Sequence, residues 1–81
     1  MRLAFSPHFV RSYEKAPAAI RRSFDKQSAL LLQNLHHPSL CAKKYGAAGD
    51  IWQARVTGAW RFYFTVEGGT YYLHEIKAHP K

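Results

Sequence analysis

Residues 50–76 read DIWQARVTGAWRFYFTVEGGTYYLHEI, and this segment decides the fold. Apolar and polar residues alternate along 51–56 and again along 60–66, with aromatic or β-branched side chains at most of the apolar positions. Such alternation is typical of strands that bury one face against a core and expose the other. The segment therefore predicts three antiparallel strands joined by two tight turns.

The pairing of the first two strands follows from which side chains share a face. Residues that lie opposite each other on antiparallel strands point to the same side, and a slip by one residue would turn an apolar row to water. Matching the two apolar rows sets Val56 opposite Trp60 across a three-residue loop, 57–59. The same register sets Arg55 opposite Arg61 on the polar face. Because like charges across a ladder cost roughly 0.2–1 kcal/mol, this pair indicates either a surface for a polyanion or two solvated arginines.

Two glycines, at 68–69, predict the second turn, since both positions of a two-residue hairpin loop favour positive φ. This turn sets Phe64 opposite Leu73 and Tyr63 opposite His74. The polar face of the predicted sheet then carries six side chains: Gln53, Arg55, Arg61, Tyr63, Tyr72 and His74. Cations, an imidazole and phenols on one sheet face make it the candidate site.

The composition predicts one small domain, residues 1–81, with a strongly basic surface. Hydrophobic residues make up 47% of the 81-residue chain, which is enough for a single core. Twelve Lys and Arg against five Asp and Glu give a formal charge of +7. A field of this sign favours RNA, DNA or an acidic protein as partner.

Several features predict a cytoplasmic protein without metal, other cofactor or membrane association. The sequence has no apolar stretch of about 18 residues, and residues 1–15 turn polar too early for a signal peptide. The single cysteine, Cys41, allows neither an internal disulfide nor a multi-cysteine metal site, and it fits a reducing cytosol. The adjacent histidines at 36–37 lack a spaced third ligand, so we interpret them as the polar end of a helix.

Two helices are predicted before the strand segment. A short first strand over 2–5 leads into Ser-Pro at 6–7, an N-cap hydroxyl followed by a proline at the first helical position. Helices are expected over 8–15 and 17–34, and the apolar stripe of the second consists of Ile20, Phe24, Leu31 and Leu35. We expect both to pack on the aromatic face of a mainly antiparallel, twisted sheet. The predicted fold is therefore α+β, in the order β-α-α-β-β-β.

Three connecting segments surround the predicted hairpins. Residues 40–45, LCAKKY, are expected to form a short strand or an extended arm, and 46–49 a loop. If 40–45 are extended, Lys43 and Lys44 point to opposite sides, so at most one shares the face of the arginines. Residues 77–81 are expected to be a basic tail at the edge of the sheet.

This order of elements, with the segments HPSLCAKKY, DIWQARV, WRFYF and the terminal IKAH, resembles the RelE/ParE superfamily of small toxins from bacterial toxin–antitoxin modules. The similarity covers nearly the whole chain and depends on the order and spacing of short motifs. It implies the toxin component of a type II module, with a cognate antitoxin that lays an acidic or amphipathic segment over the basic face or along the helices. The RelE-like branch further implies a metal-independent endoribonuclease that cleaves mRNA during translation, with mRNA and the ribosome as further partners.

The resemblance also assigns roles to individual residues. Arg61 matches the family's strand arginine and would clamp the scissile phosphate, because a guanidinium is planar, bidentate and always charged. Arg55 would be a second phosphate contact. His79, after the last strand, would act as general acid or base, or else is an ordinary histidine in a tail. RNA-binding side chains are expected to be Lys43, Lys44, Tyr63, His74 and Lys77.

The sequence departs from the family pattern at two places. Gln53 stands where some ribosome-dependent members carry a lysine, and Lys81 is not followed by the tyrosine or short helix found in some members. A general base is left to His74, Tyr63 or Glu75. Two other functions stay open: a ParE-like toxin that inhibits DNA gyrase without nuclease chemistry, and a non-catalytic domain that binds RNA or protein on the same fold.

Overall fold

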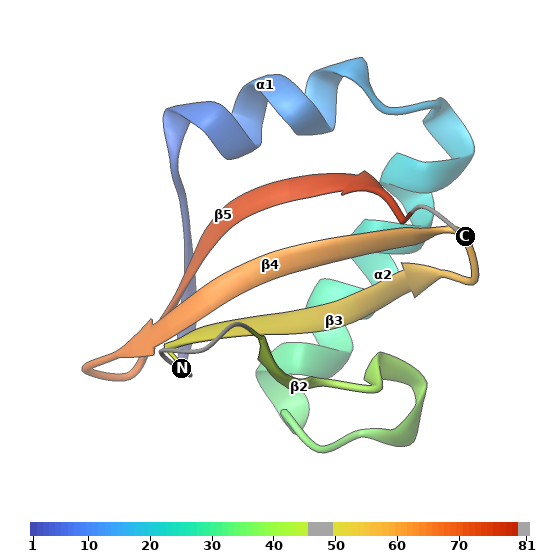
Figure 1. Cartoon of the computed structure of the whole chain (residues 1–81). Helices are drawn as coiled ribbons and strands as arrows, with labels where there is room; N and C mark the ends of the chain where they lie inside the picture. Colours follow the sequence, from blue (N-terminus) through green and yellow to red (C-terminus); the bar gives the residue numbers. More distant parts are fainter. Residues whose placement is uncertain (46–49, 80–81) are drawn as a thin grey trace.

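Over residues 1–45 and 50–79, which the computed structural model describes, the chain forms two α-helices, one short 3-10 helix and a five-stranded sheet (Figure 1). The elements are, in order, β1 (Arg2–Phe5), α1 (Pro7–Lys15), α2 (Ala18–Gln33), the 3-10 helix η1 (Pro38–Leu40), β2 (Lys43–Tyr45), β3 (Ile51–Thr57), β4 (Trp60–Glu67) and β5 (Thr70–Ala78). The strand order is β1-β5-β4-β3-β2, in which β1 and β5 are parallel and the other neighbours are antiparallel.

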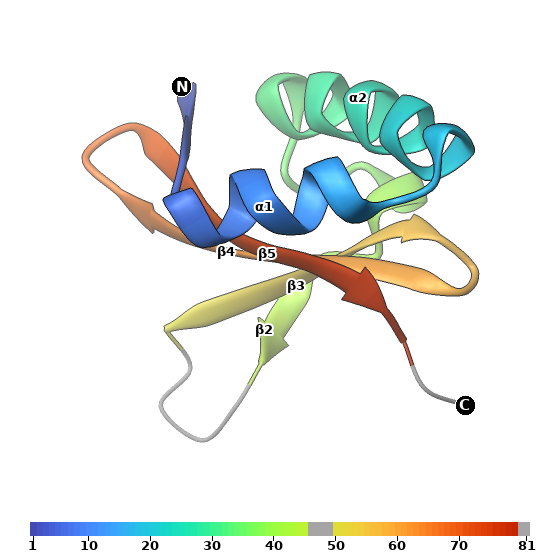
Figure 2. The ribbon, with the colours of Figure 1, turned by 90° about the horizontal axis from the view of Figure 1, so that it is seen from above.

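The predicted α+β class and the placement of the helices are confirmed. Figure 2 shows both helices on one side of the sheet, where α1 packs against β5 and α2 against β3. The predicted order β-α-α-β-β-β lacks one strand, because residues 43–45 pair with β3 as strand β2 rather than forming an arm. The loop expected at 46–49 lies outside the described residues.

The helix boundaries follow from local chemistry. The Ser6 hydroxyl accepts a hydrogen bond from the Phe9 N–H at 3.0 Å, and Pro7 occupies the first helical position, as predicted. The helix η1 was not predicted; there, His37 Nδ1 accepts a hydrogen bond from the Ser39 N–H at 3.1 Å. This turn places the Leu40 side chain in the core, where it is fully buried. No described helix is apolar over a length that could cross a membrane.

The core lies between the helices and the aromatic rows of the sheet. Phe62 of β4 meets Phe24 of α2 edge-to-face at 5.2 Å between ring centroids and stacks on Phe64 at 5.7 Å. The largest fully buried side chains are Phe9, Leu31, Leu40, Phe62, Phe64, Leu73 and Ile76. Because the apolar side of β3, β4 and β5 faces the helices, the polar side of these strands is left uncovered.

The β3–β4 pairing confirms the opposition of Arg55 and Arg61 but corrects the turn. Thr57 pairs with Trp60, so the loop has two residues instead of the predicted three. The register shifts between Arg55 and Thr57, and Val56 is the extra residue. This β-bulge keeps Val56 buried, at 5% exposure, while the turn shortens by one residue.

The β4–β5 pairing also contains a bulge, which corrects the predicted partner of Tyr63. Gly68 and Gly69 have φ of 52° and 77°, as the predicted turn requires, and Phe64 pairs with Leu73. Beyond that point the register shifts, and Tyr63 pairs with Glu75 instead of His74. Without the shift, a carboxylate would face the core and an isoleucine would face water, so the bulge restores the burial pattern.

A buried glutamine joins α2 to β3 and η1. Gln27 is only 5% exposed, and its amide nitrogen donates to the carbonyl oxygens of Arg55 at 2.9 Å and Ser39 at 3.0 Å. The Ser39 hydroxyl donates back to Gln27 Oε1 at 3.1 Å. The backbone at Arg55 is therefore fixed to the helix layer, while its side chain lies on the opposite face.

We expect Gln27→Leu to lower the free energy of unfolding by about 2 kcal/mol, because the Arg55 and Ser39 carbonyls lose their donor. Urea denaturation measures the change. Gln33→Leu is the matched control, since Gln33 lies exposed at the end of the same helix and should change stability by less than about 0.5 kcal/mol. Equal stability of the two variants would contradict the role of the buried amide.

Candidate active site

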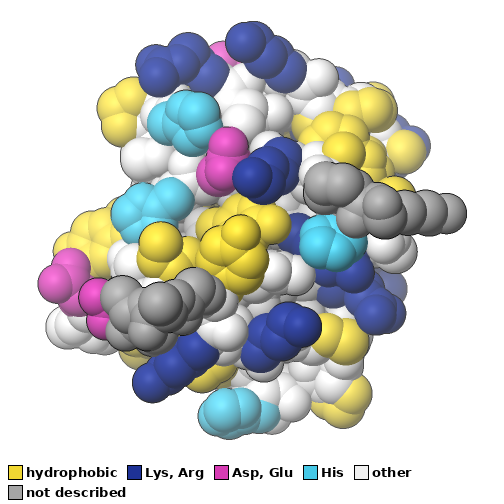
Figure 3. All heavy atoms as spheres, viewed as in Figure 1, with side chains coloured by type: hydrophobic (Ala, Val, Ile, Leu, Met, Phe, Trp, Pro, Cys, Tyr) yellow, Lys and Arg dark blue, Asp and Glu magenta, His cyan; other side chains and the backbone are white. Residues whose placement is uncertain are grey.

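The uncovered side of the sheet carries a hollow with a volume of about 520 Å³. Its lining residues are Cys41, Lys43, Lys44, Tyr45, Gln53, Arg55, Arg61 and His79. Figure 2 shows β2 turned away from the helices, which curves the sheet on this side. Figure 3 looks onto this face and shows Lys and Arg side chains gathering over its lower right part. We call this feature the basic hollow.

The charge of the basic hollow is of one sign. Among the described residues that line it there are four cations and no Asp or Glu. Arg55 and Arg61 lie directly opposite each other on β3 and β4, in the predicted register. Because like charges side by side are unfavourable on their own, the arrangement is suited to a bound anion that lies between them.

The Arg61 side chain is held by the turn between β3 and β4. Its Nη1 donates to the carbonyl oxygens of Thr57 at 2.7 Å, Trp60 at 3.1 Å and Gly58 at 3.3 Å. All three bonds use one nitrogen, so Nη2 and Nε have no hydrogen-bond partner within the part of the chain that the structure describes. The guanidinium is thus fixed in position and keeps donors for a ligand.

His79 is anchored to the same turn. Its backbone N–H donates to the Ala59 carbonyl oxygen at 2.7 Å, directly after β5 ends at Ala78. The imidazole is exposed and lines the basic hollow together with Arg61. The short β3–β4 turn therefore positions both the histidine and the arginine that the sequence assigned to the site.

Strand β2 supplies the remaining wall. Lys43 pairs with Gln53 and shares its face, whereas Lys44 pairs with Trp52 on the core side. The Lys44 ammonium lies 6.0 Å from the Trp52 ring centroid, and Lys44 also borders the hollow. Thus, of the two lysines, Lys43 places its charge on the face of the arginines, in agreement with the expectation that at most one does.

Three further predicted RNA-binding residues do not line the hollow. Tyr63 is 7% exposed, between the Tyr45 ring at 5.3 Å and the Lys77 ammonium at 5.3 Å from its own centroid. His74 lies in the β-bulge, and its Nε2 is 2.9 Å from the Thr65 hydroxyl. The basic hollow therefore includes, of the predicted set, Lys43, Lys44, Arg55, Arg61 and His79.

Two lining residues, Cys41 and Tyr45, were not predicted. Tyr45 is separated from Lys43 by one residue, so the alternation of a strand places both on one face. That signal was present in LCAKKY, but its use required the pairing of β2 with β3. Cys41, a free thiol, adopts a left-handed conformation with φ of 47° where η1 ends.

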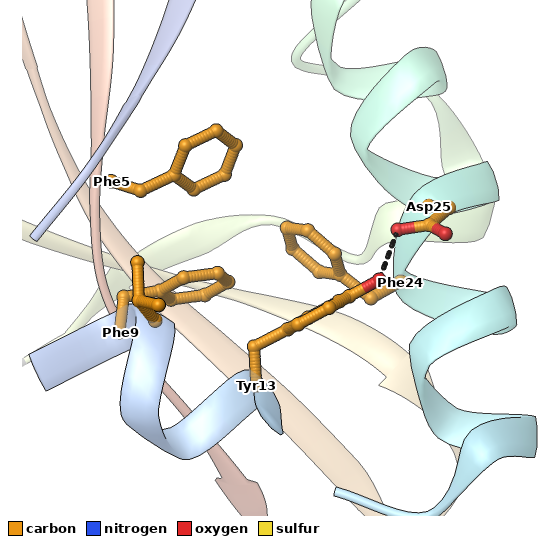
Figure 4. Close-up of a pocket in the computed structure, with 6 residues that line it drawn as sticks. Phe5, Phe9, Tyr13, Phe24 and Asp25 are labelled. Atoms are coloured by element: carbon orange, nitrogen blue, oxygen red, sulfur yellow. Dashed lines mark hydrogen bonds between the residues drawn. The ribbon is translucent and has the colours of Figure 1, made fainter. Parts of the chain in front are cut away.

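A second hollow lies on the helix side of the sheet, and its described lining residues include no histidine, lysine or arginine. It is a notch of about 250 Å³ between β1, α1 and α2, lined by Phe5, Phe9, Val10, Tyr13, Phe24 and Asp25 (Figure 4). Its one carboxylate, Asp25, accepts a hydrogen bond from the Tyr13 hydroxyl at 3.0 Å. Desolvation, and then the Asp25 carboxylate, raise the pKa of Tyr13, so the phenol stays protonated at neutral pH. This notch offers an apolar contact surface but no charge for a phosphate.

Known proteins match this chain in structure and not in sequence. No protein-family model and no curated protein matches the sequence. A YoeB/ParE toxin from Agrobacterium tumefaciens superposes with a TM-score of 0.82 over 99% of this chain and 100% of its own, at 15% identity. The chain has the RelE/ParE fold.

Two further solved structures share the RelE/ParE fold. The RelB–RelE antitoxin–toxin complex from Methanococcus jannaschii matches with a TM-score of 0.75 at 21% identity, over 93% of this chain and 88% of that chain. The isolated RelE toxin of E. coli matches with a TM-score of 0.76 at 13% identity, over 98% and 84%. The resemblance inferred from the sequence is thereby confirmed in fold, and the chemistry is argued from this chain's own residues.

Proposed function

We propose that this protein is the toxin of a toxin–antitoxin module and that it cleaves mRNA in the basic hollow. The observation that carries the proposal is the grouping of Arg55, Arg61 and His79 around one hollow on the uncovered sheet face. Two guanidinium groups suit a phosphodiester that gains negative charge as it reacts. An imidazole can give and take protons near neutral pH.

The proposed reaction is an internal transfer at phosphorus. The ribose 2′-oxygen forms a bond to the adjacent phosphorus, the bond from phosphorus to the 5′-oxygen breaks, and a 2′,3′-cyclic phosphate remains. His79, as imidazolium, gives its proton to the departing 5′-oxygen, and the proton of the 2′-hydroxyl passes to water. Arg61 and Arg55 stabilise the charge on the phosphorane oxygens. Because Arg61 is already held by the turn carbonyls, little reorganisation is needed as this charge develops.

The same charge distribution suits an antitoxin. The chain carries a formal charge of +7, and one of the solved structures with this fold is an antitoxin–toxin complex. An acidic segment of a cognate antitoxin laid over the basic hollow would neutralise the cations and block access of RNA. The substrate that fits this proposal is mRNA that is being translated on the ribosome, in the cytoplasm.

We expect His79→Ala to slow mRNA cleavage about 10²-fold, because the 5′-oxygen loses its proton donor. Cleavage of a reporter mRNA in a translating extract measures the change. The fold should be retained, since the imidazole is exposed and the bond from residue 79 to Ala59 uses the backbone N–H. His36→Ala is the matched control, because His36 is also exposed but does not line the hollow.

The wild-type protein separates the proposal from its alternatives. A ParE-like gyrase inhibitor would leave the reporter mRNA intact while expressing cells accumulate DNA damage. A non-catalytic domain would leave both intact and be harmless when overexpressed in soluble form. Full cleavage activity of His79→Ala would remove the histidine from the reaction and return it to an ordinary tail residue.

A further inference from the structure

A second basic groove lies beside the basic hollow, between α1 and the free edge of β5. It has a volume of about 300 Å³. Its lining residues are His8, Arg11, Ser12, Lys15, Ala16, Trp60, Glu75, Ile76, Lys77 and Ala78. The parallel partner β1 covers only the first part of β5, through Leu73, and α1 lies along the rest. The Ser12 hydroxyl accepts a hydrogen bond from the Ile76 N–H of this edge at 3.2 Å, which fixes the width of the groove.

The groove is basic because its one acid is already engaged. Glu75 contacts His8 Nε2 at 3.1 Å with one carboxylate oxygen and Lys77 Nζ at 3.7 Å with the other. Arg11 and Lys15 are exposed and four residues apart on α1, which places them on one side of the helix at a rise of about 6 Å. Across the groove, they face a carboxylate that is already in contact with His8 and Lys77.

The groove and the basic hollow meet at one pair of residues. Lys77, which lines the groove, lies directly opposite Arg61, which lines the hollow, on adjacent strands. Figure 3 shows Lys and Arg side chains both over α1, at the top of this face, and over the sheet below it. A chain of phosphates at Arg55 and Arg61 can therefore continue along Lys77 toward Lys15 and Arg11, over a surface whose acidic side chain, Glu75, already contacts His8 and Lys77.

We propose that this groove binds the single-stranded RNA that adjoins the scissile phosphate, with phosphates held by Arg11, Lys15 and Lys77. This inference rests on the proposed ribonuclease function, since it places the flanking strand of the same substrate. Trp60, partly buried at the end of the groove, adds an aromatic surface for a base. An acidic peptide would also contact the cations, but the continuity of the groove with the phosphate site favours RNA.

The test is the affinity of the full chain for RNA of two lengths, each carrying a 2′-O-methyl group at the scissile position so that it cannot be cleaved. One probe is a trinucleotide that fills the hollow only, and the other extends far enough to reach α1. We expect the double variant Arg11→Ala, Lys15→Ala to bind the long RNA with about tenfold lower affinity. The slope of the logarithm of its binding constant against the logarithm of salt concentration should fall in magnitude by about 1.4, and the affinity for the trinucleotide should not change. Arg22→Ala with Lys26→Ala is the matched control, because it removes the same charges at the same spacing from the exposed side of α2.

The outcomes separate the inference from the function on which it rests. If Arg61→Ala weakens both RNAs while the α1 variant binds the long RNA as wild type does, the groove proposal is overturned and the nuclease proposal stands. If Arg61→Ala lowers the affinity for neither RNA, the proposed function is wrong, whatever the α1 variant does. If the α1 variant loses affinity for a polyglutamate peptide and not for RNA, the groove is a protein-binding surface and the inference is wrong.

Discussion

Arg61→Ala is expected to slow mRNA cleavage by about 10²–10³-fold, the range found when one preorganised donor to a developing oxyanion is removed. Of the two arginines in the basic hollow, Arg61 is the one whose guanidinium is fixed by the turn, through bonds to the Thr57 and Trp60 carbonyl oxygens. It therefore needs no reordering to meet the phosphorane. Single-turnover cleavage of a bound mRNA measures the chemical step directly.

The same hydrogen bonds require a control for stability. Removal of the guanidinium also frees the turn carbonyls, which we expect to cost about 1 kcal/mol of folding free energy. Thermal unfolding of the variant gives this loss, and cleavage is then measured at a temperature where the variant is fully folded. Arg22→Ala, on the exposed side of α2, should cleave as wild type does.

Arg61→Lys distinguishes charge from geometry. A lysine keeps the positive charge but cannot present two parallel donors to a phosphate. We expect activity between that of the wild type and that of Arg61→Ala. Wild-type activity in the folded Arg61→Ala variant would show that the phosphate does not react beside this residue, and the assignment of the basic hollow would be lost.

The alternation of apolar and polar residues was sufficient to predict which face of the sheet meets the helices. It failed where the period changes. Leu73 and Ile76 are both buried although they are three positions apart, an odd spacing that a regular strand cannot bury on one side. The bulge at His74 resolves this conflict, and the odd spacing was the signal for it. At Val56 the apolar pattern was equally compatible with a longer turn, so the sequence could not locate that bulge.

Only those parts of the candidate site that follow from the pairing of neighbouring strands could be predicted from the sequence. The opposition of Arg55 and Arg61 followed from strand register alone and is confirmed. The position of His79 beside their turn follows only once the bulge at His74 is included in the register, which pairs Ala78 with Trp60 and lets the His79 N–H donate to the Ala59 carbonyl oxygen. Gln27 had a local signal, a polar residue within the apolar stripe of α2, but its partners are set by tertiary packing.

Phe62→Ala is expected to lower the free energy of unfolding by about 3–5 kcal/mol and the melting temperature by at least about 12 °C. Phe62 is fully buried, and its ring contacts both Phe24 of α2 and Phe64 of the same strand. The truncation leaves a cavity between the helix layer and the centre of the sheet. Calorimetry and urea denaturation measure the loss, and Phe5→Ala is the matched control, because Phe5 is 49% exposed.

Phe62 and Arg61 are neighbours on β4, and strand geometry sends one to the core and the other to the basic hollow. The two alanine variants should therefore lose activity in different ways. Phe62→Ala removes activity by unfolding, so cleavage should recover on cooling to a temperature where the variant is folded. Arg61→Ala should remain slow at every temperature where it is folded. Recovery of Arg61→Ala on cooling would show that its arginine stabilises the turn without acting on the phosphate.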